Sequence, residues 1–278
     1  MTADGAGRHV DRHDAATGTG RHVDRHDAAT GAGRQVDWDE AADRYAHSRV
    51  HVTDTAAYEP PVTEALGDAP PGPVVDLGAG TGIWSGVLAG WTGRTVVAVE
   101  PAAGMRRHAA ADPRPAVHHV AAHADRLPLR DGTAGGAWLS AVLHHVGDIA
   151  TCARELRRVL APGAPVLIRG AFAGRVDHLP QVHFFPEVRR RFDQFPGVEA
   201  TEAAFGASGF RRRSLTVVQE GSVDLRAWRD LLPQQRASDT SLVHLSDDEF
   251  AAGLRRIDAA LAAGTARAGA GLDLLVLS

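Results

Sequence analysis

Short apolar runs rich in valine alternate with amphipathic segments between residues 73 and 172. The runs have the length of buried strands, and the segments between them place apolar residues three or four positions apart, as helices do. Strands are predicted at 73–80, 94–100, 116–124, 135–143 and 164–172, and helices at 82–91, 102–111 and 148–160. Alternation of this kind produces βαβ units, so a parallel sheet covered by helices is predicted.

The pattern becomes less regular after Phe172, and all eight phenylalanines lie at or beyond this residue. Further helices are predicted at 201–210, 224–232 and 246–264, and further strands at 214–221 and 272–278. The predicted fold is a doubly wound, mostly parallel seven-stranded α/β sheet that forms one domain over residues 37–278. Helical insertions at about 173–205 and 222–266 are expected to form a lid over the substrate, and the arginines at 189–191 are expected to face solvent.

Residues 1–36 contain a tandem repeat, because "RHVDRHDAATG" occurs at Arg8–Gly18 and again at Arg21–Gly31. The segment has almost no large apolar side chain with which to offset the entropy of ordering, so a disordered tail is predicted. Its histidines recur four residues apart, a spacing that on a helix could hold a metal ion. No carboxylate or thiolate pattern accompanies them, so no metal site is predicted.

Charge and composition exclude several function classes. The net charge of −4 offers no basic surface for a nucleic-acid backbone. The chain has no lysine, which excludes a Schiff-base lysine and the Gly-Lys-Ser/Thr phosphate loop. The lone Cys152 excludes a disulfide framework and is predicted to be a buried helix residue. No run is apolar and long enough to span a membrane, so a cytoplasmic protein without a membrane partner is expected.

Three glycines in "DLGAGTG", at positions 78, 80 and 82, stand where the first strand should pass into a helix. Glycine permits a sharp turn and lets a ligand approach the backbone, while the helix N-terminus offers unpaired N–H groups. A dinucleotide site would require G-x-G-x-x-G, but Ile83 and Ser85 occupy the two possible third positions. The loop therefore favours a nucleotide-type ligand other than a nicotinamide dinucleotide.

Further candidate residues follow the loop at the ends of successive strands. Glu100 ends the second strand, where a carboxylate can accept hydrogen bonds from both hydroxyls of a ribose. Asp125 follows the third strand, and His144 and His145 follow the fourth. This order resembles the class I S-adenosylmethionine-dependent methyltransferases, particularly the small-molecule (type 11) group similar to the methyltransferases of ubiquinone and menaquinone synthesis. The match runs from about Trp38 to Phe172 and resumes weakly in the last strands.

The resemblance implies S-adenosylmethionine as cofactor and S-adenosylhomocysteine as product. It implies that backbone at Gly78 and Gly80 contacts the methionine part, that Glu100 binds the ribose and that Asp125 binds the adenine amine. The full set of implied cofactor-binding residues is Tyr45, Arg49, Asp76, Gly78, Ala79, Gly80, Gly82, Glu100, Pro101, Met105, Ala124, Asp125, Arg126, Ser140, Ala141 and His145. Structural roles stay open for three of these: loop ordering for Asp76, core packing for Met105 and solvent exposure for Arg49.

A methyl group on a sulfonium is already activated, so the protein needs mainly to position the acceptor and exclude water. His145 and His144 are the candidate bases, and His178, His183 and Phe184 are candidate substrate contacts. The fourth strand ends in "LSAV" rather than in the Asn/Asp-Pro-Pro-aromatic sequence that grips a flipped base, so a small organic acceptor, from secondary metabolism, is predicted. Two alternatives stay open: a non-methylating cyclisation or rearrangement that uses the bound cofactor, and a non-catalytic binding module. A homodimer is possible.

Overall fold

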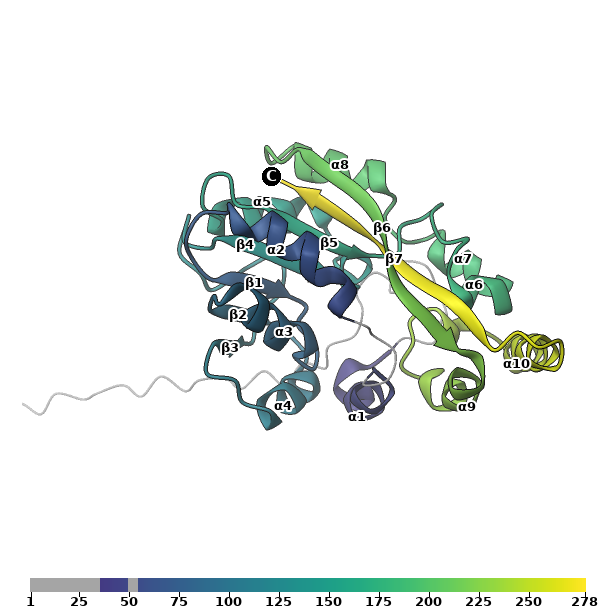
Figure 1. Cartoon of the computed structure of the whole chain (residues 1–278). Coiled ribbons are helices and arrows are strands. Elements are labelled where there is room, and N and C mark those ends of the chain that lie inside the picture. The colour runs from purple at the N-terminus through teal and green to yellow at the C-terminus, as the bar shows by residue number, and fades with distance from the viewer. Residues whose placement is uncertain (1–35, 50–54) are drawn as a thin grey trace, which may run out of the picture.

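The computed structural model describes residues 36–49 and 55–278, and it forms one seven-stranded sheet with the order β3-β2-β1-β4-β5-β7-β6 (Figure 1). β1 to β5 are parallel to their neighbours, while β7 is antiparallel to both β5 and β6. The strands are β1 Val74–Leu77, β2 Val96–Val99, β3 Val117–Val120, β4 Gly136–Ser140, β5 Val166–Gly170, β6 Arg212–Asp224 and β7 Arg267–Leu277. The predicted α/β fold is confirmed; the repeat within the predicted tail lies outside the described residues.

Helices cover both faces of the sheet, which explains why its strands are continuous apolar runs. α2 and α3 pack on one face around Tyr58, Leu88 and Trp138, and α5 and α8 pack on the other. The helices are α1 Trp38–Arg49, α2 Glu59–Gly67, α3 Ile83–Thr92, α4 Ala103–Ala111, α5 Ile149–Val159, α6 Pro180–Phe184, α7 Arg189–Phe192, α8 Val198–Gly206, α9 Leu225–Gln235 and α10 Asp247–Ala262, with short 3₁₀ turns at Ala56–Tyr58, Leu143–His145, Pro186–Val188 and Leu242–His244.

Two observations bear on the exclusions drawn from composition. Cys152 is buried in the face of α5 that meets the sheet, and this burial raises the pKa of its thiol to about 12, as expected for an inert core residue. In the part of the chain that the structure describes, no helix combines the length and the apolar character that crossing a membrane requires.

The last two strands are longer than predicted and extend past the carboxyl edge of the sheet. β5 pairs with residues 273–277 of β7, whereas β6 pairs with β7 down to residue 267. Beyond β5 the two strands therefore form a two-stranded ribbon, and α9 and α10 lie at its far end (Figure 1). The ribbon residues of β7, "RAGAG", are small and polar, so their sequence lacks the apolar alternation that identifies a strand.

A second hydrophobic core, here called the lid core, lies between residues 176–195 and the helices α9 and α10. Its aromatic members are Phe184, Phe185, Phe192, Phe195, Trp228 and Phe250. The phenylalanine-rich segment thus folds against α9 and α10. The end of the predicted insertion at 173–205 lies elsewhere, because α8 packs against α5 in the main core.

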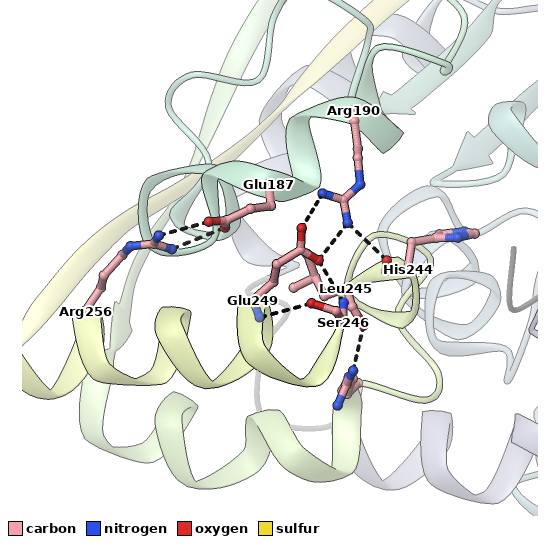
Figure 2. A network of polar contacts seen from close by, with 8 residues as sticks. Glu187, Arg190, His244, Leu245, Ser246, Glu249 and Arg256 are labelled. Atoms are coloured by element: carbon pink, nitrogen blue, oxygen red, sulfur yellow. Dashed lines mark hydrogen bonds and ion pairs between the residues drawn. The ribbon is translucent and has the colours of Figure 1, made fainter.

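Ion pairs at the surface of the lid core connect the segment 186–192 to α10 (Figure 2). Arg190 Nη1 and Nη2 lie 2.7 and 2.8 Å from the two carboxylate oxygens of Glu249, and Arg256 Nη2 lies 2.9 Å from Glu187 Oε1. Glu249 also completes a capping box with Ser246 at the start of α10. The expectation that the arginines at 189–191 face solvent is wrong for Arg191, which is buried with its guanidinium 5.5 Å from the centre of the Phe195 ring.

Gly253 allows α10 to approach the lid core closely, and Gly253→Ala is expected to destabilise the protein by about 1–3 kcal/mol through overpacking. A Cβ at this position would lie 2.0 Å from two ring atoms of Phe185. The midpoint of urea unfolding should fall. Gly90→Ala in α3 is the control, since no atom lies within 4 Å of its added Cβ and alanine favours helix there. An equal rise in both midpoints would contradict the expectation.

Candidate functional site

The glycine loop after β1 turns back against the end of β2. Gly78, Gly80 and Gly82 have φ angles of 71°, 55° and 80°, in the left-handed region that glycine enters without steric penalty. The N–H groups of Gly78 and Ala79 both donate to the carbonyl of Val99, at 2.8 and 3.0 Å. This pairing fixes the loop against β2 and exposes its next backbone groups beyond the carboxyl edge of the sheet.

Glu100 connects the glycine loop to the turn after β2. Its Oε2 accepts from the backbone N–H of Gly80 at 2.9 Å, and its Oε1 accepts from that of Ala102 at 2.8 Å. Burial raises the pKa of the carboxyl, and the two backbone N–H groups oppose that shift. Each oxygen can still accept one more hydrogen bond, so the fixed carboxylate can receive two donors from a ligand.

Asp76 lies beneath the loop in the buried face of β1. Ser85 Oγ donates to its Oδ2 at 2.6 Å, which joins the end of β1 to the first turn of α3. Burial is the main reason that the pKa of Asp76 is raised to about 7. Asp76 does not line the cavities described below, and its contacts are those of a residue that orders the loop.

Asp76→Asn is expected to remove a pH dependence of stability. Between pH 4 and pH 7 the folded protein holds a proton on Asp76 that the unfolded chain releases, so the free energy of unfolding falls as pH rises through this window. The slope contributed by one group is at most about 1.4 kcal/mol per pH unit. Urea unfolding from pH 4 to pH 8 should show a shallower decline in the variant, whereas the exposed control Asp68→Asn should follow the unaltered protein. Parallel curves for Asp76→Asn would refute this assignment.

Two connected hollows at the carboxyl edge form what is here called the glycine-loop cavity. Gly78, Pro101, Val142 and His145 border both hollows. The structure brings most of the predicted cofactor residues to its walls, namely Tyr45, Gly78, Gly80, Glu100, Pro101, Met105, Ala124, Asp125, Ser140, Ala141 and His145. Ala79, Gly82 and Arg126 do not line it. Arg49 ends α1, and its side chain lies outside the described residues.

α1 forms one wall of the glycine-loop cavity. Trp38 meets the rings of Tyr45 and His145 edge to face, with ring centres 5.6 and 5.4 Å apart. Asp39 Oδ1 accepts from the backbone N–H of Gly104 at 2.6 Å, which attaches α1 to the first turn of α4. α1 therefore encloses the site beside the sheet.

A second cavity, here called the lid cavity, lies between the sheet edge and the lid core. Its walls include Gln181, Phe192, Arg169, Glu220 and Trp228. Ala141, His144 and Thr240 border both the lid cavity and the glycine-loop cavity, so the two are neighbours. The His144 ring stacks on Phe195 with centres 4.0 Å apart and planes 4° apart, which fixes the imidazole at this junction.

Backbone strain is found at the same junction. Ala141, directly after β4, has a φ of 51°, and across residues 36–49 and 55–278 it is the one non-glycine residue with a positive φ. A conformation that alanine rarely adopts persists when the surrounding structure enforces it, and such residues concentrate at functional sites. The predicted fourth strand, 135–143, is shortened to Gly136–Ser140 by this turn.

The predicted substrate contacts lie away from the lid cavity. His178 and His183 are exposed, and Phe184 is buried in the lid core with its ring centre 6.0 Å from that of Trp228. Sequence reasoning missed Arg169 and Glu220. One indication was available, since Arg169 interrupts the otherwise apolar strand "PVLIRGAF", where a charge requires a buried partner.

A family model described as a methyltransferase domain matches residues 75–168, which run from the glycine loop's strand through β5. Residues 75–168 are therefore similar to a methyltransferase domain. Over 120 residues the chain is 32% identical to a malonyl-[acyl-carrier protein] O-methyltransferase of Pseudescherichia vulneris, covering 42% of this chain and 45% of that protein. Over 105 residues it is 37% identical to a demethylmenaquinone methyltransferase of Mycolicibacterium vanbaalenii, covering 38% and 44%.

The methyltransferase domain also has solved structural neighbours. A putative methyltransferase from an antibiotic biosynthesis pathway of Anabaena variabilis superposes with a TM-score of 0.62 at 20% identity, covering 79% of this chain and 96% of that one. The structural neighbour confirms the predicted fold, and residues 75–168 match the family that the sequence resembles. The chain spans less than half the length of the curated relatives it matches, and the two relatives are named for different acceptors, so the acceptor is not fixed by similarity.

Proposed function

We propose that this protein binds S-adenosylmethionine in the glycine-loop cavity and transfers its methyl group to a small organic acceptor in the lid cavity. The observation that carries the proposal is the junction of the two cavities at Ala141, His144 and Thr240. A cofactor in one cavity and an acceptor in the other would meet there. The cofactor would supply an electrophilic methyl group. The residues of this chain would position the acceptor against that group and exclude water from the reaction.

The cavity walls fit the proposed cofactor. An added Cβ at Gly80 would meet no protein atom within 4 Å, so the backbone borders open space of the kind a ligand can fill. Glu100 would accept hydrogen bonds from the two ribose hydroxyls through its remaining lone pairs. Asp125, which lines the second hollow, would accept one from the adenine amine. Tyr45 on α1 and Met105 on α4 would enclose the nucleoside.

The protein's own groups would then act on the acceptor. Phe192, Phe195 and Trp228 give the lid cavity an apolar wall that excludes water from the transfer. His144 borders both cavities. Its proposed role is that of a general base, which takes the proton from a methyl acceptor that binds in its protonated form. His145 faces the glycine-loop cavity beside Trp38, so its proposed role is contact with the cofactor.

Calorimetry with S-adenosylmethionine and S-adenosylhomocysteine, followed by incubation of candidate acceptors with methyl-labelled cofactor, tests the proposal. Binding of both nucleosides and a product heavier by one labelled methyl group are expected. A consumed acceptor whose mass is unchanged would instead indicate the non-methylating rearrangement, and absence of nucleoside binding would indicate a non-catalytic module. We further propose that the acceptor belongs to secondary metabolism. We also propose that the protein forms a homodimer, and sedimentation of the full chain would test this oligomeric state.

A further inference from the structure

We propose that Glu220 recognises the acceptor: one oxygen of its buried carboxylate receives a hydrogen bond from an O–H or N–H group of a neutral, largely aromatic molecule. This inference rests on the proposed function, since it assigns the chemistry of the lid cavity. Three observations support it: the inward position of Glu220 on β6, the two donors that hold its carboxylate, and the charges around that carboxylate.

Glu220 lies on the inward face of β6, directly before a β-bulge. The register between β6 and β7 shifts between Gln219 and Ser222, and Gly221 within the shift has a φ of 82°. Such a bulge adds a residue to one strand and turns the neighbouring side chains in a new direction. Val217 and Gln219 of this edge strand are exposed on one face, whereas Val218 and Glu220 alternate onto the other face. The Glu220 side chain is therefore only 8% exposed, and it lines the lid cavity.

Two donors fix one oxygen of this carboxylate. Tyr58 Oη donates to Glu220 Oε1 at 2.7 Å, and Arg169 Nη2 forms an ion pair with the same oxygen. Burial raises the pKa of Tyr58, so its hydroxyl keeps the proton that it donates. The other oxygen, Oε2, accepts no hydrogen bond from any residue that the structure describes. Oε2 is not among the fully buried atoms that lack a partner, so it faces the lid cavity, and a ligand that displaces water there must supply a donor in its place.

Arg169 is held by the protein at both terminal nitrogens and is already paired with Glu220, while its buried Nε has no partner among the described residues. Its Nη1 donates to Ser140 Oγ at 3.1 Å, and its guanidinium carbon lies 4.9 and 5.1 Å from the ring centres of Tyr58 and Trp84. With its charge balanced by Glu220, the pair is neutral overall. A neutral acceptor therefore enters without adding an unbalanced charge, whereas an anionic one would meet the unpaired carboxylate oxygen.

The wall around Glu220 defines the rest of the acceptor. Leu179, Phe192, Phe195 and Trp228 surround the cavity with apolar and aromatic surface. Glu220 and Gln181 are polar groups on this wall that can orient a ligand. Ser140 borders the glycine-loop cavity and contacts Arg169, so the anchor lies one side chain away from the proposed site of transfer.

Matched fluorinated probes test the inference on the full chain saturated with S-adenosylhomocysteine. Fluorine NMR titrations would compare 4-fluorophenol, which carries a donor, with 4-fluoroanisole, which has the same ring without one, and with the anion 4-fluorobenzoate. The phenol is expected to bind about tenfold or more tightly than either other probe, as for a hydrogen bond to a charged group. Equal binding of phenol and anisole, or tighter binding of benzoate, would overturn the inference without any variant.

Glu220→Gln provides the residue-specific test. The glutamine carbonyl can still accept from Tyr58 and Arg169, while its NH₂ group would face the cavity as a donor. The preference for phenol over anisole should fall at least about tenfold, with S-adenosylhomocysteine affinity unchanged because Glu220 does not line the glycine-loop cavity. Glu64→Gln makes the same chemical change on the exposed surface of α2, outside both cavities, and is the control that should keep the preference. Loss of the preference in Glu64→Gln, or its persistence in Glu220→Gln, would contradict the assignment.

A second variant keeps the test decisive if Glu220→Gln does not fold. Tyr58→Phe removes one of the two donors to Oε1 but keeps the ring that stacks on Arg169. The preference for phenol should fall below that of the unaltered protein, because one donor instead of two then orients the carboxylate, and an unchanged preference would contradict the inference. If the unaltered protein binds no S-adenosylhomocysteine, the proposed function fails first, which separates the two failures.

Discussion

Glu100→Ala is expected to reduce the affinity for S-adenosylmethionine about a hundredfold or more, because it removes two hydrogen bonds to a charged acceptor. The same change also releases the loop. Without the carboxylate, the backbone N–H groups of Gly80 and Ala102 lose their acceptor. The ligand contacts and the shape of the loop therefore depend on one side chain. Calorimetry with S-adenosylhomocysteine avoids turnover and gives the affinity directly.

Two further variants separate these contributions. Glu100→Gln keeps one carbonyl acceptor and most of the volume, so its loss of affinity should be smaller than that of Glu100→Ala. Glu64→Ala on the exposed surface of α2 is the control and should bind as the unaltered protein does. If Glu100→Ala binds S-adenosylhomocysteine with undiminished affinity, the glycine-loop cavity is not the cofactor site.

Gly78→Ala is expected to lower stability by about 2–5 kcal/mol, from left-handed backbone strain and overpacking together. The added Cβ would lie 2.2 Å from Cγ2 of Val142, a residue of the turn between β4 and the His144 segment. Relief of that clash requires the loop or the turn to move, and both border the glycine-loop cavity. Cofactor affinity should therefore fall together with the melting temperature.

A glycine with the same backbone conformation supplies the control for Gly78→Ala. Gly132 has a φ of 66°, compared with 71° for Gly78, but no atom lies within 4 Å of the position of its Cβ. Gly132→Ala should show the strain alone and leave cofactor affinity unchanged. Equal losses of stability in the two variants would mean that the contact with Val142 has no energetic effect.

The sequence by itself determined the sheet and one half of the site. Runs such as "PVVDLGAG" and "RTVVAVE" are apolar because the strands are covered on both faces, and this makes them recognisable without tertiary information. Parallel strands bring their carboxyl ends to one edge, so Gly80, Glu100 and Asp125 were predicted to meet, and they border one cavity. Local order along the chain was sufficient for these residues.

Only the tertiary structure decided which residues form the lid cavity. The extension of β6 and β7 depends on backbone pairing between small and polar residues, which leaves little trace in hydrophobic periodicity. Glu220 lies beside Val218 on the inward face of β6, and its partners Tyr58 and Arg169 are 162 and 51 residues away in sequence. The histidines at 178 and 183 were plausible by type but face outward. Side-chain direction in an insertion follows from packing, and packing joins residues that no short motif contains.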